Sequence, residues 1–358
     1  MRAIPFLLLL ALSGLASAAE FPKPVEGDFV VRDFKVNAGP TLSELRIHYR
    51  TLGKPIRGAD GKVANAVLVL HGTTGAGSNF VEGTGAQLFA GELFGKGQLL
   101  DSDRYFLVLP DGIGHGKSSK PSDGLRAKFP HYGYEDMIRA HYLLLTEGLK
   151  VDHVRLVMGT SMGGMHTWLW AQRYPDFMDA LLPLASLPTQ ISGRNRMWRR
   201  IVIDAIRTDP EWRNGDYEKP PHGMQTAAQM LSFMSGNPVM RQQSGPTLKA
   251  ADEDFDREVS RRVRTMDAND TLYAVDASWD YDPGPGLEKI KAPLLAINFA
   301  DDLINPPELG ILEREIKRVP KGKALTIPAS RETVGHGTHT KAVVWKSHLE
   351  ALLKETAR

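Results

Sequence analysis

The chain has 358 residues, of which 24% are charged and 42% hydrophobic, and its 44 basic and 42 acidic side chains give a formal net charge of +2. These proportions are typical of a soluble globular protein and exclude a disordered or fibrous chain. The balanced charge predicts no nucleic-acid partner, because such partners bind clustered basic residues. The absence of cysteine excludes disulfides, thiolate metal sites and thiol catalysis.

The first 19 residues have the pattern of a secretory signal peptide. The basic Arg2 precedes an apolar run from Ile4 to Ala16, and small residues up to Ala18 suit a signal peptidase. This run is shorter than the roughly 20 residues that a bilayer crossing needs. We therefore predict that residues 1–19 direct export to the periplasm or the medium and are then removed, leaving no integral membrane segment. An uncleaved N-terminal anchor is the alternative.

Eight short apolar segments predict strands, and helical patterns such as 134–149 and 163–174 lie between them. The later strands are continuously hydrophobic, as expected where both faces of a parallel sheet are buried. This alternation predicts an α/β fold with a mostly parallel central sheet flanked by helices. The expected strands are 29–36, 45–52, 66–70, 105–110, 154–158, 181–185, 294–299 and 324–327.

The alternation of strands and helices stops between residues 187 and 293. This stretch has helical patterns, several methionines and no clear buried strand. We predict a helical lid insertion, residues 187–293, within one domain that spans residues 20–358. Met230, Met234 and the region of Trp198 are interpreted either as core or as the lining of an acyl pocket. A basic cluster is interpreted either as a solvated face or as a carboxylate-binding group; it consists of Arg194, Arg196, Arg199 and Arg200.

The segment Gly159–Gly163 is the G-x-S-x-G sequence of this chain, with Ser161 at its centre. It lies between a predicted buried strand and an apolar helix, which is the context of a nucleophilic serine on a sharp turn. The glycines on either side permit the strained backbone. We predict that Ser161 is a nucleophile and that the N–H of Met162 stabilises an oxyanion. The alternative is a structural serine in a tight turn.

A serine nucleophile needs a base and an acid that orients the base, and in this architecture they follow in the order Ser, Asp/Glu, His. Asp302 follows a late strand and is the predicted acid, with its neighbour Asp301 as the alternative. His336, between two glycines, is the predicted base, with His339 as its rival. The two histidines could also be metal ligands, but no H-E-x-x-H motif accompanies them.

Two glycine-rich loops follow predicted strands. In the loop after strand 66–70, Thr73 is predicted to offer its backbone N–H as the second oxyanion donor. The loop 111–118 has its third glycine misplaced for dinucleotide binding, so we interpret it as a loop that lines the rim of the site.

These residues together resemble an α/β-hydrolase-fold protein and, more narrowly, the homoserine O-acetyltransferase family. The resemblance implies a Ser161–His336–Asp302 triad and a helical lid. The family typically has an Asp directly after the catalytic His, where it helps to bind the amino group of homoserine, and this chain has Gly337 there. The similar segments are 49–53, 65–72, 100–106, 129–130, 159–165, 205–217, 302–307 and 335–336.

The expected function is ester hydrolysis outside the cytoplasm through an acyl-enzyme on Ser161. The alternative is acyl transfer to a substrate hydroxyl, as in the homoserine O-acetyltransferases. A third hypothesis, a binding protein on an inactive hydrolase fold, fits poorly with an intact Ser, His and Asp set. The expected partner is a small-molecule ester or acyl donor, with no cofactor and no metal, and a homodimer is left open.

Overall fold

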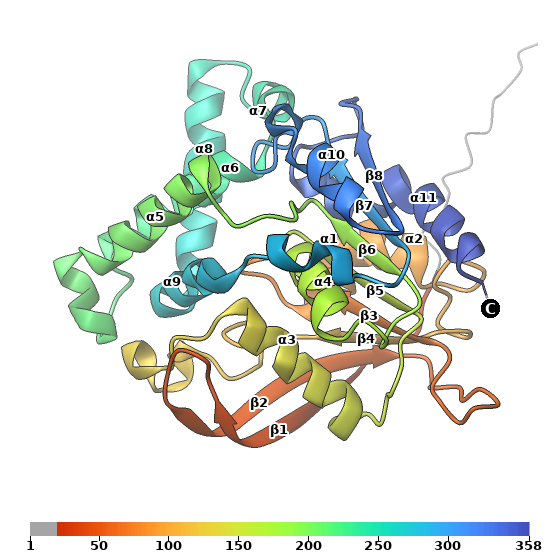
Figure 1. The fold of residues 1–358 in the computed structure, drawn as a ribbon. Coiled ribbons are helices and arrows are strands. Elements are labelled where there is room, and N and C mark those ends of the chain that lie inside the picture. Colours follow the sequence, from red (N-terminus) through yellow and green to blue (C-terminus); the bar gives the residue numbers. More distant parts are fainter. Residues whose placement is uncertain (1–19, 358) are drawn as a thin grey trace, which may run out of the picture.

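The computed structural model describes residues 20–357, so the predicted signal peptide lies outside the described residues. Within them the chain forms a mostly parallel sheet of eight strands in the order β1-β2-β4-β3-β5-β6-β7-β8 (Figure 1). β1 pairs antiparallel with β2, and β2 pairs antiparallel with β4, whereas the remaining neighbours are parallel. The strands are β1 Val25–Lys35, β2 Thr41–Leu52, β3 Ala66–Leu70, β4 Phe106–Pro110, β5 Leu156–Thr160, β6 Leu181–Leu184, β7 Leu294–Phe299 and β8 Gly322–Ile327.

Helices cover both faces of the sheet, which confirms the predicted α/β architecture. Successive residues of β3 point to opposite faces, so Leu68 packs in a core with the helices α3 and α4 while Val69 packs in a core with α2 and α11. The predicted helix 134–149 consists of α3 and a π-helical turn at Leu144–Gly148. These helices are α1 Gly83–Gly85, α2 Gly91–Leu93, α3 Tyr134–Leu143, α4 Met162–Arg173, α10 Ile311–Glu315 and α11 Ala342–Glu355.

Between β6 and β7 the chain is helical, and Figure 1 shows its longer helices standing together beside the sheet. They bury a core of their own that includes Trp198, Met224 and Met234. The role of this segment as a lid stays a prediction. Its helices are α5 Gly193–Arg207, α6 His222–Ser235, α7 Pro238–Ser244, α8 Leu248–Thr265 and α9 Ala268–Asp276.

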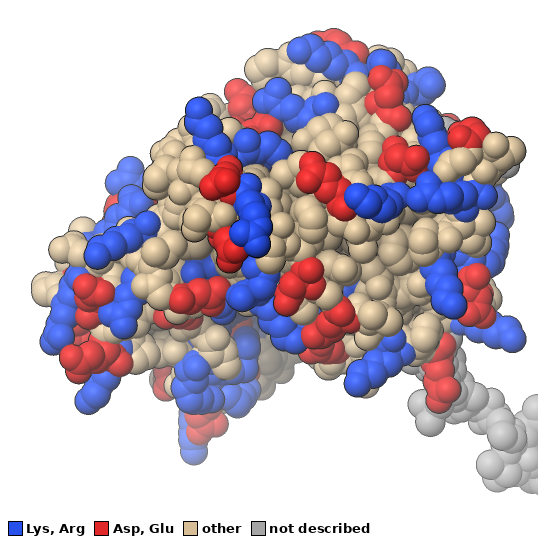
Figure 2. Space-filling model, turned by 90° about the horizontal axis from the view of Figure 1, so that it is seen from below, with Lys and Arg blue, Asp and Glu red and all other residues tan. Residues whose placement is uncertain are grey.

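Helix hydrophobicity and surface charge bear on whether the protein binds a membrane or a charged partner. None of the helices in residues 20–357 combines the length and hydrophobicity that a membrane crossing requires. Figure 2 shows basic and acidic side chains interspersed over the face turned toward the viewer. That face therefore offers no extended patch of one sign to a charged partner.

Candidate active site

Ser161 occupies a sharp turn between β5 and α4. Its backbone has φ 56° and ψ −113°, in the left-handed half of conformational space that a side chain other than glycine rarely adopts. A Cβ atom on Gly159 would lie 2.2 Å from the carbonyl group of Gly163, and one on Gly163 would lie 2.0 Å from the carbonyl oxygen of Leu70. Both glycines are therefore required by close packing, and together they hold the serine above the carboxyl end of the strand.

The three predicted triad residues meet at this turn, although they come from distant parts of the chain. The Nε2 atom of His336 lies 2.8 Å from the Oγ of Ser161, and its Nδ1 lies 2.7 Å from the Oδ2 of Asp302. Both ring nitrogens are thus engaged, one with the hydroxyl and one with the carboxylate. This arrangement lets the imidazole accept the hydroxyl proton while the carboxylate fixes its tautomer. The catalytic roles themselves stay predictions at this point.

Asp302 is buried and held in one orientation. Its Oδ1 accepts the backbone N–H groups of Ile304 at 2.7 Å and Asn305 at 3.1 Å, and its Oδ2 accepts the Asn305 side-chain amide at 3.2 Å. Burial by itself would raise the pKa of Asp302, but the charge and hydrogen bond of His336 and the two backbone donors outweigh it, so the pKa is lowered. Asp302 is therefore an anion beside the imidazole.

The two alternatives from the sequence occupy different positions. Asp301 accepts the backbone N–H of Gly335 at 3.0 Å and the side-chain amide of Asn237, so it anchors the loop that carries His336 without touching the ring. His339 lies with its ring centre 5.1 Å from that of His336. Burial and the neighbouring His336 lower the pKa of His339 to about 3, which leaves it neutral. Among residues 20–357, no group of three or more His, Cys, Asp or Glu side chains is arranged to hold a metal ion.

The two predicted oxyanion donors also lie next to Ser161. Met162 is the first residue of α4, where a backbone N–H has no partner within the helix. A Cβ atom on Gly72 would lie 3.4 Å from the Cβ of Ser161. The next residue, Thr73, lines the same cavity as Ser161. In residues 20–357 neither the Met162 N–H nor the Thr73 N–H donates a hydrogen bond to another residue, so both are free to stabilise an anion.

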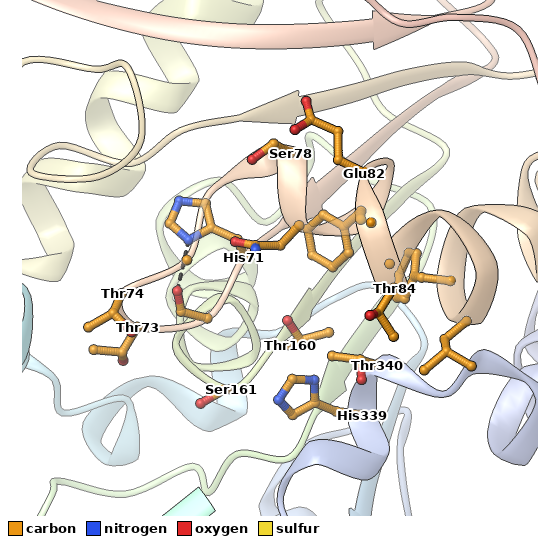
Figure 3. Close-up of a pocket in the computed structure, with 18 of the residues that line it drawn as sticks. His71, Thr73, Thr74, Ser78, Glu82, Thr84, Thr160, Ser161, His339 and Thr340 are labelled. Atoms are coloured by element: carbon orange, nitrogen blue, oxygen red, sulfur yellow. Dashed lines mark hydrogen bonds between the residues drawn. The ribbon is translucent and has the colours of Figure 1, made fainter. Parts of the chain in front are cut away.

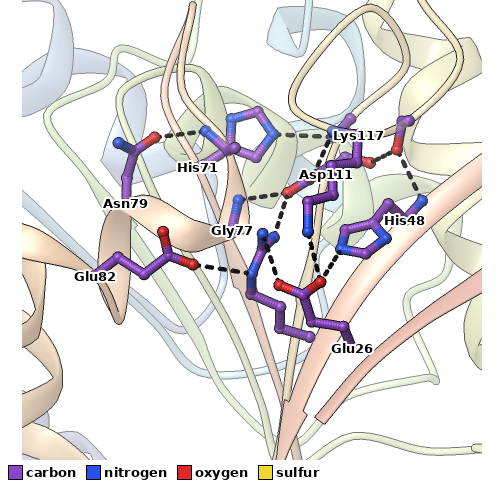
Figure 4. A network of polar contacts seen from close by, with 12 residues as sticks. Glu26, His48, His71, Gly77, Asn79, Glu82, Asp111 and Lys117 are labelled. Carbon is purple, nitrogen blue, oxygen red and sulfur yellow. Dashed lines mark hydrogen bonds and ion pairs between the residues drawn. The ribbon is translucent and has the colours of Figure 1, made fainter. Parts of the chain in front are cut away.

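A polar network fixes the loop that carries Thr73 (Figure 4). The Nε2 of His71 accepts the backbone N–H of Gly112 at 2.9 Å, and its Nδ1 donates to the carbonyl of Gly72 at 2.8 Å. The buried Asp111 accepts the N–H of Gly77 at 2.7 Å and forms an ion pair with Arg50 at 3.2 Å. Residues 111–118 are not among the described walls of the Ser161 cavity. Gly114, His115 and Gly116 line a neighbouring cavity together with Thr74 and Gly75, so the role of this loop at the rim stays a prediction.

The cavity above Ser161 has a volume of about 710 Å³ (Figure 3). Its walls come from residues 71–89 and from the turn that follows His336, and among the described residues the helical segment 187–293 contributes none of them. Met230, Met234 and Trp198 pack within the helical core instead, so the acyl-pocket interpretation does not hold for this cavity. A second cavity of about 290 Å³ adjoins residues 187–195 and includes Asn305.

Sequence reasoning missed the residues that hold the triad in place. Asn305 donates its side-chain N–H to the carbonyl of Ala185 at 2.9 Å as well as to Asp302, and so ties the acid to the end of β6. Asn237 reaches Asp301 from the helical segment. Asn305 could have been found from the sequence, because it lies three residues after the predicted acid, in the segment 302–307. Asn237 could not, because it is 64 residues away from Asp301 in the sequence.

Comparisons with known proteins agree with the α/β-hydrolase fold. A family model described as the alpha/beta hydrolase fold matches residues 65–332. The chain is similar to a homoserine O-acetyltransferase of Geotalea daltonii, with 30% identity over 338 residues that cover 85% of this chain and 90% of that protein.

Two solved structures share the fold at low sequence identity. The homoserine O-acetyltransferase of Bacillus anthracis has a TM-score of 0.79 and 20% identity, covering 93% of this chain and 98% of that one. An acetylester hydrolase of Corynebacterium glutamicum has a TM-score of 0.78 and 19% identity, covering 92% and 96%. The same architecture therefore occurs in proteins named for acyl transfer and in proteins named for ester hydrolysis.

Proposed function

Because the chain belongs to the α/β-hydrolase family and lies close to the homoserine O-acetyltransferases, we propose that it transfers an acyl group, through an acyl-enzyme on Ser161, to the hydroxyl of a small acceptor. The observation that carries this proposal is the pair of contacts made by His336, 2.8 Å to Ser161 and 2.7 Å to Asp302. Such a pair activates a hydroxyl that is otherwise a weak nucleophile.

The reaction proceeds in two half-reactions. In the first, His336 takes the Ser161 proton as Oγ attacks the carbonyl carbon of the donor, and the Met162 and Thr73 N–H groups stabilise the oxyanion. His336 then gives that proton to the leaving group, and the acyl group stays on Oγ. In the second, the acceptor hydroxyl loses its proton to His336 and attacks the acyl carbon, after which Oγ recovers the proton.

Ester hydrolysis, in which water replaces the acceptor, is the second candidate. Two observations favour it. The described residues of the helical segment do not line the Ser161 cavity, so they do not exclude water from it. Gly337 has no carboxylate that could bind the ammonium group of an acceptor such as homoserine. The identity with curated homoserine O-acetyltransferases supports acyl transfer more strongly. We therefore place transfer ahead of the hydrolysis that the sequence alone favoured.

One assay separates the two candidates. Purified protein is given 4-nitrophenyl acetate or acetyl-CoA, with and without L-homoserine, and the products are identified by mass spectrometry. Acyl transfer predicts O-acetylhomoserine as the main product, and hydrolysis predicts acetate whatever the acceptor concentration. A protein that turns over neither donor in a Ser161-dependent manner would contradict both candidates.

We also propose that residues 1–19 are a signal peptide, as the sequence predicts. The full chain and a variant that starts at residue 20 are expressed in the same bacterial host, and the cells are fractionated. The full chain is expected in the periplasm with a new N-terminus near residue 19, as read by intact mass, and the shortened chain in the cytoplasm. An intact chain in the membrane fraction would show an anchor instead, and an intact chain in the cytoplasm would contradict export.

A further inference from the structure

The turn between α6 and α7 brings the helical segment into contact with the loop that carries His336. Asn237 occupies this turn, and only 4% of its surface is exposed. Its side-chain amide donates to the Oδ2 of Asp301 at 2.5 Å and to the carbonyl of Thr333 at 3.4 Å. In Figure 1, α7 lies beside the blue part of the chain that follows β8. One buried side chain thus joins the helical segment to the loop of the acid and to the loop of the base.

The Oδ2 atom of Asp301 is the point at which these three parts of the chain meet. It accepts the amide of Asn237 and, at 3.0 Å, the backbone N–H of Gly335, the residue before the base. The other oxygen, Oδ1, is buried and has no hydrogen-bond partner within residues 20–357. Burial of a carboxylate is costly unless donors satisfy it. The two hydrogen bonds at Oδ2 therefore hold Asp301 in place, and Asn237 supplies one of them.

Gly335 also packs directly against Asn237. A Cβ atom on Gly335 would lie 3.1 Å from the Cβ of Asn237 and 3.2 Å from its backbone nitrogen. The φ angle of Gly335 is 67°, a conformation that favours glycine. The next residue is His336, whose Nε2 lies 2.8 Å from the Oγ of Ser161. The backbone before the base is thus in contact with Asn237 both by packing and through the shared carboxylate.

We propose that Asn237 is a positioning residue that couples the helical segment to the catalytic base. This inference rests on the proposed function and adds a way in which the helical segment acts on the reaction. The described residues of that segment line none of the Ser161 cavity, so this coupling does not involve the substrate. It runs from Asn237 through Asp301 and Gly335 to the imidazole. A displacement of Asn237 therefore changes the rate of proton transfer rather than the affinity for the substrate.

Two substitutions change this contact while they keep a second role of Asn237. Its Oδ1 accepts the N–H of Met240 at 2.6 Å and so caps α7, and Ser and Asp are equally good capping residues. The Ser side chain is too short to reach Asp301, and the Asp side chain places a second carboxylate against Oδ2. With 4-nitrophenyl acetate, we expect Asn237→Ser to lower kcat by about 3- to 10-fold and to keep KM within about twofold, because the base is displaced and the cavity is not.

Asn237→Asp is expected to show the coupling in its pH dependence. Two carboxylates that share a site do not both ionise readily, so one of them takes up a proton as the pH falls. The protonated side chain can then donate across the contact as the amide does. We expect kcat to be about 10- to 100-fold below wild type at pH 8, and the ratio of variant to wild type to rise severalfold by pH 5.5. Asp302 and His336 are present in both proteins, so their own titration cancels in this ratio. A ratio that does not change with pH would contradict the coupling through Asp301.

The cap of another helix in the same segment controls for a general loss of stability. The Thr247 hydroxyl accepts the N–H of Ala250 at 3.2 Å and caps α8. Thr247→Ala should lower the melting temperature, as the loss of a cap does, and keep kcat within about twofold. The inference is overturned if Asn237→Ser has the kcat of wild type. It is also overturned if Thr247→Ala lowers kcat as much as Asn237→Ser at an equal loss of melting temperature.

Proton NMR of the free protein separates this inference from the proposed function, because it needs no substrate. The proton between the Nδ1 of His336 and Asp302 gives a resonance far downfield of the amide protons. We expect this resonance to be unchanged in Thr247→Ala and to shift or broaden in Asn237→Ser. If it responds in this way but no ester is turned over through Ser161, the proposed function fails and the coupling stands. If esters are turned over through Ser161 and neither kcat nor the resonance responds to Asn237→Ser, only the coupling fails.

Discussion

Replacement of Ser161 by Ala is expected to lower kcat/KM for 4-nitrophenyl acetate by about 10,000-fold or more, which corresponds to about 5.5 kcal/mol of transition-state stabilisation. The variant keeps His336, Asp302 and the free N–H groups of Met162 and Thr73, but it has no oxygen to accept the acyl group. Hydrolysis by water alone then has to cross the whole barrier in one step. The measurement is the initial rate of nitrophenolate release, together with labelling by a fluorophosphonate and mass analysis of the labelled peptide.

A matched control is available in the same cavity. Ser78 lines it as Ser161 does, but the hydroxyl in contact with the imidazole of His336 is that of Ser161. Ser78→Ala should therefore keep activity within about threefold and should still be labelled. Both variants should unfold at temperatures close to that of wild type. Retention of more than a tenth of the activity in Ser161→Ala would refute the assignment of the nucleophile.

The sheet could be predicted from sequence because its strands are apolar and bounded by turn residues. All eight predicted segments overlap strands of the structure. The errors lie at boundaries: β1, β2 and β8 begin two to four residues before the predicted strands, and β5 continues past Met158, where the sequence predicts its end. Gly159 and Thr160 resemble a turn in composition, yet they stay in the ladder because they pair with Pro183 and Leu184 of β6. Pairing between strands decides such boundaries, and it is not visible in a local pattern.

The choice between the two adjacent aspartates shows a different limit. Both follow β7, and their order relative to Ser161 and His336 is the same, so the chain order that identified the site could not separate them. Asp302 is the one that reaches His336. Asp301 is drawn instead to Asn237 and to the backbone of Gly335, and these contacts depend on how distant segments fold over the sheet.

The burial of Arg199 could have been predicted from its position on helix α5. Arg199 shares one face of α5 with Val202, Ile203 and Ile206, at spacings of three, four and seven residues, and all four side chains are buried. A helical period places such residues together on the inner face. Treating the four arginines of the basic cluster as one group hid this difference, because membership in a charged run says nothing about the side of the helix on which a residue lies.

Asp302→Asn is expected to lower kcat/KM by about 10,000-fold at neutral pH, and it also loses the contact between Oδ2 and the side-chain amide of Asn305. An amide oxygen at this position can still accept the N–H groups of Ile304 and Asn305 that hold the carboxylate now. The amide N–H₂ would then donate to the Nδ1 of His336, which moves the ring proton to Nε2. An imidazole protonated at Nε2 cannot accept the proton of Ser161, so the nucleophile is not activated.

Asp301→Asn provides the matched comparison, because it makes the same chemical change one residue away. It weakens the contacts with Asn237 and Gly335 that anchor the His336 loop, so we expect a lower melting temperature and a loss of activity of less than about tenfold. Both variants are assayed with the same ester, and their folding is compared by thermal unfolding. The acid is misassigned if Asp301→Asn loses as much activity as Asp302→Asn while remaining equally folded, since a residue that only anchors the loop leaves the tautomer of His336 unchanged.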